Sequence, residues 1–250
     1  MTFRSLIAAA TLLFSMGFPV QALDIGQMSP AERAAFRTEI RNYLLENPQV
    51  IMEAVAVLEQ RQQETQGQMD RDLAAANRAD LFDDPQSWVG GNPDGDITLV
   101  EFMDYRCGYC RRAFPEIEQL IETDGNIRFI LKEFPILGDE STLAARFAIA
   151  TQQVAGDDAY KAIHDALMTV NGPINETSLS RLAETLGFEV QPILDHMASA
   201  DVTAVIDANR ALGARLQING TPSFVMNDEM LRGYLPLDAM LQIAADIRSQ

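Results

Sequence analysis

The chain has 250 residues, and its 36 Asp and Glu residues outnumber its 19 Lys and Arg residues, so its formal net charge is −17 at pH 7. This length is enough for one or two domains. The acidic balance argues against a nucleic-acid-binding protein, because such proteins carry a basic surface.

Residues 1–22 have the pattern of a secretory signal peptide. Arg4 supplies the positive start, Leu6 to Phe18 is an uncharged and mostly apolar run, and Ala22 offers a small residue for cleavage before Leu23. The apolar run is shorter than the roughly 20 residues that a membrane span needs. We therefore expect a cleaved signal rather than a membrane anchor, and export to an oxidising compartment such as the periplasm.

Two helices are predicted after the signal. Ser29-Pro30-Ala31-Glu32 is typical of a helix start, with Ser at the N-cap and Pro at the first position. Asn47-Pro48 should end this helix, and a second one is expected from Pro48 to Asn77. Apolar residues recur on one face of each helix as far as Leu58, and polar residues follow.

This narrow apolar stripe needs a partner. One interpretation is that it folds back on its own domain. The other, which we favour, is that it meets copies of itself, so that residues 30–60 make a homo-oligomer whose subunit number the pattern does not fix. We accordingly predict a helical oligomerisation or stalk segment over residues 23–80.

A compact domain is expected over residues 81–250, beginning near Leu81. Its predicted elements come in the order strand, helix, strand, long helical block, two strands, helix. Two turn segments, Asp83-Asp84-Pro85 and Gly90-Gly91-Asn92-Pro93-Asp94-Gly95, precede the first strand. Trp88 lies between them and is interpreted as a packing residue. The predicted bounds are Ile97–Met103, Cys107–Thr123, Ile127–Phe134, a helical insertion at about 140–216, Ser223–Met226, Met230–Tyr234 and Leu237–Ile247.

The two cysteines of the chain, Cys107 and Cys110, stand where the first strand gives way to a helix. A Cys-x-x-Cys at such a junction is typical of a redox motif. The helix N-terminus favours an anion, so Cys107 should be the exposed attacking thiolate and Cys110 the buried resolving thiol. A purely structural disulfide would be poorly placed here, because so small a loop constrains the unfolded chain little.

The chain resembles the DsbA-like branch of thioredoxin-fold proteins in several motifs. These are Glu-Phe-Met-Asp-Tyr-x-Cys-x-x-Cys, the proline five residues beyond Cys110, the helical insertion and Gly-Thr-Pro-Ser-Phe at residues 220–224. Residues 33–63 resemble the N-terminal oligomerisation segment of ScsC-type periplasmic proteins. The resemblance implies an α/β thioredoxin fold with a helical insertion, preceded by an N-terminal helical segment.

The resemblance also implies roles for residues around the cysteines. Pro222 would be a cis-proline facing the pair, although the sequence alone does not show whether the Thr221–Pro222 bond is cis. Thr221, with Gly108 and Tyr109 between the cysteines, would contact an extended client chain. Glu101 would be the buried acid that accepts or relays the proton of Cys110. Two partners are open for Lys132, namely Glu101 on the neighbouring strand or Glu133 at the surface.

The dipeptide Gly108-Tyr109 contains no histidine, and His164 and His196 are interpreted as incidental. The Cys107 thiolate should then be less stabilised than in DsbA, which makes a weaker oxidant, although Arg111 and Arg112 offer some positive potential. Gly-Tyr and the Thr before the proline resemble DsbC-type isomerases. We therefore expect an isomerase or reductase that acts on client proteins with disulfides and exchanges electrons with a membrane redox partner.

Two alternatives remain open at this stage. The first is a net oxidase that donates its disulfide to clients. The second is a periplasmic copper(I)-binding protein, because soft thiolates suit that ion and Met103 and Met226 are candidate additional ligands by position. For the favoured function we expect no cofactor and no resident metal.

Overall fold

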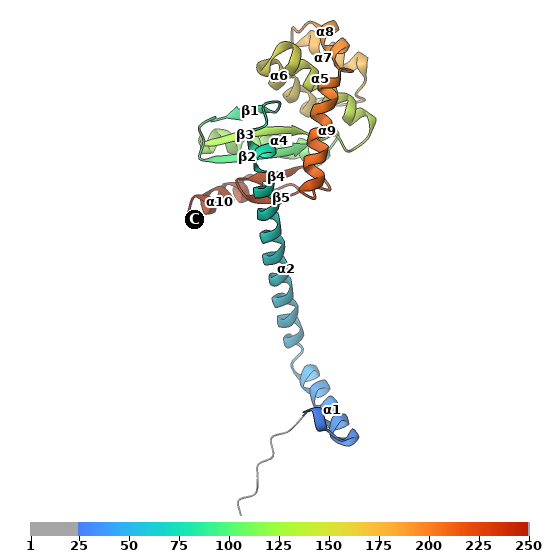
Figure 1. Cartoon of the computed structure of the whole chain (residues 1–250), viewed down its shortest axis with the longest axis vertical. Helices are drawn as coiled ribbons and strands as arrows, with labels where there is room; N and C mark the ends of the chain where they lie inside the picture. Colours follow the sequence, from blue (N-terminus) through green and yellow to red (C-terminus); the bar gives the residue numbers. More distant parts are fainter. Residues whose placement is uncertain (1–24, 250) are drawn as a thin grey trace, which may run out of the picture. The chain divides into compact units, whose positions relative to one another are not determined.

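The computed structural model describes residues 25–249, so the predicted signal peptide lies outside the described residues (Figure 1). The chain divides into two compact units, which meet between Glu59 and Gln60. Within the described residues, no helix combines the length and the apolar character that crossing a membrane requires.

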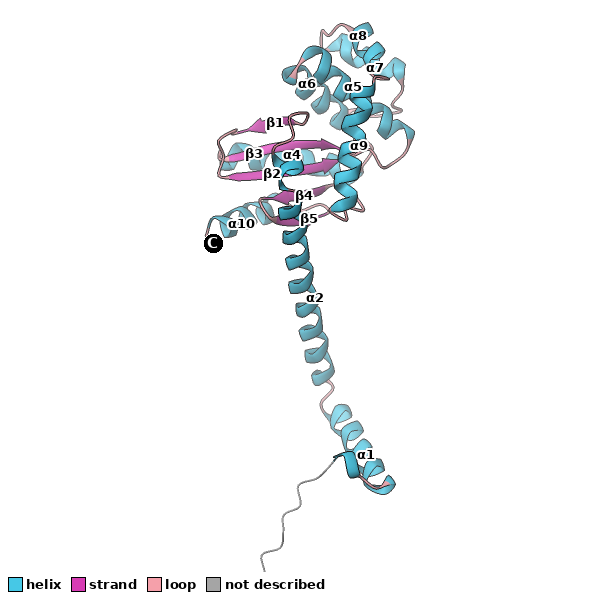
Figure 2. Cartoon of the chain, in the orientation of Figure 1, coloured by secondary structure: helices cyan, strands magenta, loops and turns pink. Residues whose placement is uncertain are grey.

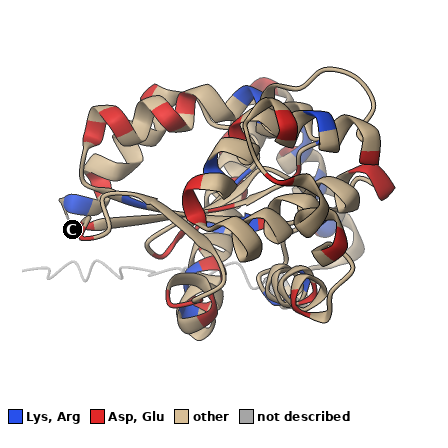
Figure 3. Ribbon diagram, turned by 90° about the horizontal axis from the view of Figure 1, so that it is seen from above, with Lys and Arg blue, Asp and Glu red and all other residues tan. Residues whose placement is uncertain are grey.

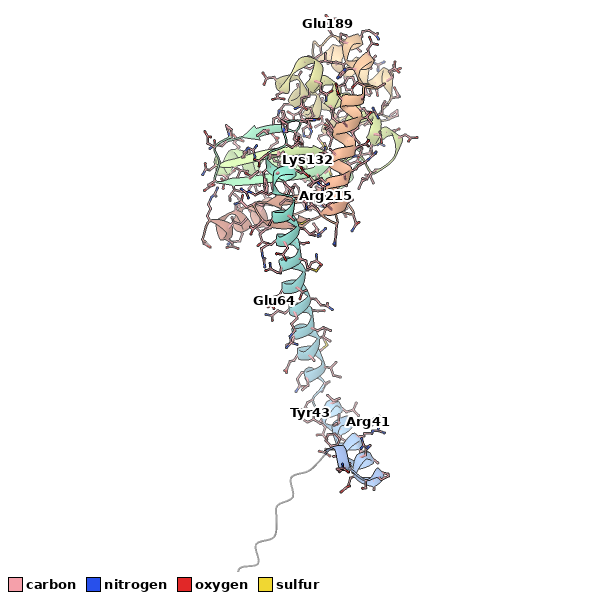
Figure 4. The ribbon with its side chains drawn as sticks, viewed as in Figure 1. Arg41, Tyr43, Glu64, Lys132, Glu189 and Arg215 are labelled. Atoms are coloured by element: carbon pink, nitrogen blue, oxygen red, sulfur yellow. The ribbon has the colours of Figure 1, made fainter. Side chains whose placement is uncertain are left out.

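The N-terminal unit begins with a short 3-10 helix, Ile25–Gln27, followed by α1, Pro30–Glu46. Ser29 caps α1 as predicted: the Glu32 backbone N–H donates to Ser29 Oγ at 3.3 Å, and the Ser29 N–H donates to Glu32 Oε2 at 2.8 Å. None of the residues of α1 is buried. Tyr43, for example, is 53% exposed and projects from the helix (Figure 4).

Helix α2, Gln49–Ala76, confirms the second predicted helix. Its last turns belong to the larger unit, where Asp70 and Ala74 are buried. Asp70 pairs with Arg232 at 2.7 Å, and the neighbouring Arg71 pairs with Glu229 at 3.3 Å. The larger unit therefore includes chain from before Leu81, and the domain boundary at residue 81 stays a prediction.

A five-stranded sheet with the order β1-β3-β2-β4-β5 forms the centre of the larger unit (Figure 2). The central strands β2 and β3 are parallel, and the other neighbours are antiparallel. The strands predicted from apolar runs have bounds that agree closely with the observed ones. The strands are β1 Trp88–Gly91, β2 Ile97–Met103, β3 Ile127–Glu133, β4 Ser223–Met226 and β5 Glu229–Arg232.

Strand β1 corrects the sequence analysis, which assigned Gly90 and Gly91 to a turn. These residues instead pair with β3. The Trp88 ring lies over the backbone of Gly90, where a Cβ would come within 2.0 Å of the ring. Glycine here therefore reflects close packing by the tryptophan rather than a turn.

Helices cover both faces of the sheet and form a separate helical block between β3 and β4. Helices α4 and α10 pack on the face formed by Leu99 and Met103, while α3, α9 and the end of α2 pack on the face formed by Val100 and Phe102. The helices of this unit are α3 Arg78–Phe82, α4 Gly108–Asp124, α5 Asp139–Ala155, α6 Asp157–Thr169, α7 Glu176–Thr185, α8 Val190–His196, α9 Ala200–Arg215 and α10 Leu237–Arg248.

Lys132 has neither of the two predicted partners. Glu101 lies opposite Leu131 in the parallel pair, so the alternation of side chains places Lys132 on the other face of the sheet. There it is buried, and its Nζ donates to Asp84 Oδ2 at 2.5 Å and to the Asp80 carbonyl at 2.9 Å. Both predictions for Lys132 are therefore wrong.

The acidic residues, which outnumber the basic ones, are distributed over many helices (Figure 3). Several are held by arginine. Arg248 at the end of α10 binds Asp96 at 2.8 Å and Asp124 at 2.6 Å, which fixes the last helix to the start of β2 and the end of α4.

Candidate active site

Cys107 is the N-cap residue of α4, and Cys110 lies in the first turn of that helix. The Cys107 backbone N–H donates to the Asp104 carbonyl at 3.0 Å, which closes the turn between β2 and α4. Both cysteines are free thiols. Cys107 is 7% exposed and Cys110 is fully buried, so the expectation that Cys107 is an exposed sulfur is wrong, although it remains the more accessible of the two.

The segment before β4 covers the Cys107 sulfur. The Thr221–Pro222 peptide bond is cis. The Thr221 carbonyl lies 3.1 Å from Cys107 Sγ and accepts the thiol proton. Residues 114 positions apart in sequence are thus brought together at the end of the central strands, as the resemblance implied.

The two sulfurs differ strongly in acidity. The pKa of Cys107 is lowered to about 5, chiefly by the Cys110 side chain, with further help from the Thr221 side chain and from the backbone N–H groups of Tyr109 and Cys110. Burial raises the pKa of Cys110 well above its ordinary value, and both Cys107 and Glu101 add to this effect. At neutral pH the reduced pair therefore holds one thiolate and one thiol, which suits Cys107 to attack and Cys110 to resolve.

Glu101 projects from β2 on the same face as the cysteines' helix and is 3% exposed. Burial, with the charges of Cys107, Glu118 and Glu133, raises its pKa to about 8. Its Oε1 is buried and has no hydrogen-bond partner in the protein. A carboxyl group with a pKa of about 8 exchanges its proton near neutral pH, and its ionised form can accept the proton of Cys110.

The lowered pKa of Cys107 predicts how the alkylation rate of the reduced protein depends on pH. Alkylation of the reduced protein should stay fast at pH 6, where a thiol of pKa about 5 is about 90% ionised and an unperturbed thiol of pKa about 8.5 is about 0.3% ionised. It should fall as the pH drops through about 5. The rate of iodoacetamide modification between pH 3 and pH 9 measures this.

Cys110→Ser is the matched control for that titration, because the Cys110 side chain is the largest contribution to the lowered pKa and a serine hydroxyl donates with different geometry. The midpoint should move above about 5 in this variant. The folded-state pKa of Cys107 lies below the unfolded value, so ionisation stabilises the reduced fold above about pH 8.5, and this contribution is lost as the pH falls through about 5. A midpoint near 8.5 in the unaltered protein would contradict the assignment.

Asp104 is a site residue that the sequence analysis missed. It is 1% exposed. Its Oδ1 accepts from the Arg106 N–H at 2.8 Å, and its Oδ2 accepts from the N–H groups of Ile136 and Leu137 at 2.8 and 3.1 Å. One carboxylate thereby holds the loop after β3 beside the cysteine turn. The sequence signal that could have indicated this role is Asp-Tyr, which stands one residue before Cys107.

A buried polar cluster behind the cysteine turn was also missed. Tyr105 and Tyr160 donate to Glu133 Oε1 at 2.7 and 2.8 Å, and Tyr105 Oη lies 3.2 Å from His164 Nδ1. Burial lowers the pKa of His164 to about 3, so its ring is neutral. His164 therefore belongs to the core beneath the site, whereas His196 contacts Gln153 at the surface.

The two arginines that follow the motif are held by other parts of the domain. Arg111 donates to the Tyr105 carbonyl at 2.8 Å and to the Val170 carbonyl at 2.6 Å, so it joins the cysteine turn to the end of α6. The Arg112 guanidinium lies over the Tyr234 ring, 4.5 Å from its centroid. The structure thus assigns both residues a packing role.

The remaining candidates divide between surface and core. Tyr109 is 62% exposed at the tip of the motif, and Gly108 has open space where a side chain would be. Met103 and Met226 are fully buried in the core that also contains the cysteines. Within residues 25–249, no group of three or more His, Cys, Asp or Glu side chains is arranged to hold a metal ion.

Comparisons with known proteins agree with this geometry. Residues 98–244 match the DSBA-like thioredoxin domain, and residues 32–64 match the N-terminal domain of the copper resistance protein ScsC. A thioredoxin-like oxidoreductase from Silicibacter pomeroyi DSS-3 is 41% identical, with a TM-score of 0.66 over 70% of this chain and 99% of that one. BcfH from Salmonella enterica Typhimurium is 30% identical, with a TM-score of 0.70 over 86% of this chain and 94% of that one.

Curated relatives share the same region. Disulfide bond formation protein D from Bacillus subtilis is 24% identical over 162 residues, which cover 60% of this chain and 72% of that protein. The chain spans only about a quarter of the length of the first curated relatives that it matches, which are NhaA Na+/H+ antiporters. The likeness to the antiporters is thus confined to one part of those longer proteins.

The match covers more than half of the chain and includes the cysteine pair, Glu101 and the cis-proline segment. The unequal acidities of the two sulfurs fit this match. The chain belongs to the DSBA-like thioredoxin domain family.

Proposed function

We propose that the protein is an exported thiol–disulfide oxidoreductase that isomerises or reduces disulfides in client proteins. The observation that carries this proposal is the pair of unequal sulfurs beside the Thr221–Pro222 segment. The pKa of Cys107 is about 5, which lies above the value of about 3.5 in the strong oxidant DsbA. A less stabilised thiolate gives a less oxidising disulfide.

The reaction begins when the Cys107 thiolate attacks one sulfur of a client disulfide. A mixed disulfide forms, and the other client sulfur leaves as a thiolate. In an isomerisation that thiolate attacks a second client disulfide and releases another client thiolate, which attacks the client sulfur of the mixed disulfide and expels the Cys107 thiolate. In a reduction it takes up a proton instead. In the second case Cys110 transfers its proton to the ionised form of Glu101 and attacks Cys107 Sγ. The bond between Cys107 and the client breaks, and the client sulfur leaves as a thiolate that takes up a proton.

The client chain would bind along the Thr221 backbone and over Gly108 and Tyr109. Thr221 lies next to the attacking sulfur, with its carbonyl oxygen 3.1 Å from Cys107 Sγ. The exposed Tyr109 ring offers an apolar surface with a polar tip, which suits unfolded client chains of varied sequence.

The N-terminal unit supports an oligomer. Its apolar side chains are exposed in the single chain, although such side chains usually find a partner. Assembly through residues 30–60 would bring several cysteine pairs around one misfolded client, which favours repeated attack on wrong disulfides. The exposed apolar residues of this segment are Phe36, Ile40, Tyr43, Leu45, Ile51, Met52, Val55, Val57 and Leu58.

A net oxidase is the second candidate, because the lowered pKa of Cys107 also makes it a good leaving group when a client thiolate attacks the oxidised pair. The reduction potential separates the two functions. Equilibration of the full mature chain with glutathione should give a potential below the value of about −120 mV that is typical of DsbA. A potential at or above that value would favour the oxidase, and tight stoichiometric copper(I) binding without disulfide exchange would favour the copper-binding alternative.

A further inference from the structure

Glu133 lies at the end of β3 in a polar pocket that nothing in the thiol–disulfide reaction above uses. It is 3% exposed. Two tyrosine hydroxyls, from Tyr105 and Tyr160, donate to the same oxygen, Oε1, while Oε2 is buried and has no partner in the protein. This arrangement fits a carboxyl group whose carbonyl oxygen accepts both hydroxyls and whose second oxygen carries a proton.

Glu133 and Glu101 face the same side of the sheet on neighbouring parallel strands. Glu101 lies opposite Leu131 and Glu133 lies opposite Met103, so the two are diagonal neighbours. With strands about 4.8 Å apart and about 3.3 Å of rise per residue, their Cα atoms are about 8 Å apart. Both carboxyl groups are buried, and each has one oxygen without a partner.

The groups that face this pair supply little positive charge. Around Glu133 lie Tyr105 from the cysteine turn, Tyr160 and His164 from α6, and Asp104; around Glu101 lie Cys107, Cys110 and Glu118 of α4. Among the described residues, no Lys or Arg side chain forms an ion pair with either carboxyl group. Burial raises the pKa of Glu133 to about 8, as it does for Glu101.

We propose that Glu133 is a second buried proton-holding site, which exchanges protons together with Glu101 as one coupled pair when the cysteines are oxidised or reduced. The inference rests on the proposed redox function of Cys107 and Cys110. The charge of Glu133 contributes to the raised pKa of Glu101, and buried carboxyl groups that interact in this way do not ionise independently. Glu133 acts on the cysteines through Glu101 and is therefore a positioning residue rather than a catalytic one.

The proton balance of the redox step shows what the pair does. When a client dithiol reduces the Cys107–Cys110 disulfide, two electrons enter, the S–S bond breaks, and two protons leave the client. Cys110 takes one proton and Cys107 stays a thiolate, so one proton remains. The new negative charge of Cys107 favours protonation of the buried carboxyl pair, which takes up this second proton.

Reduction potentials measured against pH test the proposal in the full mature chain. One proton per two electrons gives a slope of 29.6 mV per pH unit. The unaltered protein should show a steeper slope between about pH 7 and pH 9. Glu101→Gln should retain a pH range in which the slope exceeds 29.6 mV per pH unit, because Glu133 still titrates. Glu133→Gln should retain such a steep segment at lower pH, because Glu101 still titrates. In the double variant the slope should be 29.6 mV per pH unit throughout.

Tyr160→Phe in the Glu101→Gln background is the matched control. It keeps the acid but removes a hydroxyl that favours the ionised form, so the steep segment should move to higher pH. If Glu133 had a purely structural role, Glu133→Gln would not move the steep segment to lower pH while Tyr160→Phe moved it to higher pH. Glutamine at 133 can still accept from both tyrosines, so its fold should be retained.

Infrared spectra of the carboxylic acid C=O band give a readout that does not depend on redox activity. Two buried acids should titrate in the unaltered protein, and one should titrate in each single Gln variant. The proposal would be overturned if the reduction potential of Glu133→Gln depended on pH as it does in the unaltered protein. It would also be overturned if Glu101→Gln alone gave a slope of 29.6 mV per pH unit. Absence of any measurable redox couple together with two titrating acids would instead count against the proposed function.

Discussion

Cys107→Ser should abolish disulfide exchange, whereas Cys110→Ser should accumulate client proteins bound through Cys107. The first variant loses the only thiolate that can attack a client, because the pKa of Cys110 is raised well above neutral pH and its sulfur is fully buried. The expected loss is at least about 10³-fold in rate, since a serine hydroxyl is not ionised at neutral pH.

Cys110→Ser retains the attacking sulfur but lacks the thiol that resolves the mixed disulfide. Client release then depends on a second client thiol, so covalent complexes should build up and separate from the free protein on a non-reducing gel. Adding reductant should cleave the mixed disulfides and release the clients. Cys107→Ser provides the control, since it should trap nothing. Full activity in Cys107→Ser, or equal trapping by both variants, would contradict the roles assigned to the two sulfurs.

Removal of residues 23–59 should leave the thiol chemistry intact and reduce isomerisation at least about tenfold. The cut falls at Gln60 because the compact unit starts there and contains buried Asp70 and Ala74. A chain that begins at Leu81 would also lose the Asp70–Arg232 ion pair, and loss of activity would then be ambiguous. The shorter protein should keep a Cys107 pKa of about 5.

A substitution in the full chain separates oligomer formation from chain length. Tyr43→Glu places a charge on the exposed apolar face of α1 and should yield monomers, whereas Glu64→Gln on α2 should leave assembly unchanged (Figure 4). Sedimentation equilibrium gives the oligomeric state, and reactivation of a client with scrambled disulfides gives the isomerase rate. If monomeric Tyr43→Glu protein isomerises at the full rate, the N-terminal segment plays no part in the chemistry.

Local sequence patterns predicted most of the fold because each depends on neighbouring residues only. Strand β2 was predicted at its observed bounds from an apolar run, and the start of α1 from the Ser29 capping box. Strand β1 was missed because Gly90 and Gly91 resemble a turn until the Trp88 ring is placed over them. That contact depends on the folded chain.

The candidate site was predictable where it follows a motif and not where it depends on strand register. Cys107 and Cys110 and the Thr221–Pro222 segment came from short motifs. Pairing with Glu133 at the surface was one of the two alternatives for Lys132, because the sequence does not show which face of β3 each side chain occupies. In the observed register with β2, Glu133 lies on the same face of the sheet as Glu101, and Lys132 lies on the opposite face.

The most direct test of the account is the rate at which the reduced, full-length mature protein reactivates a client with scrambled disulfides, compared with the rate at which its oxidised form introduces disulfides into the same client when reduced. We predict that reactivation is catalysed, needs Cys107 and exceeds the oxidation rate. Rapid oxidation of the reduced client with no reactivation of the scrambled one would contradict the proposed function and would assign the protein to the oxidases.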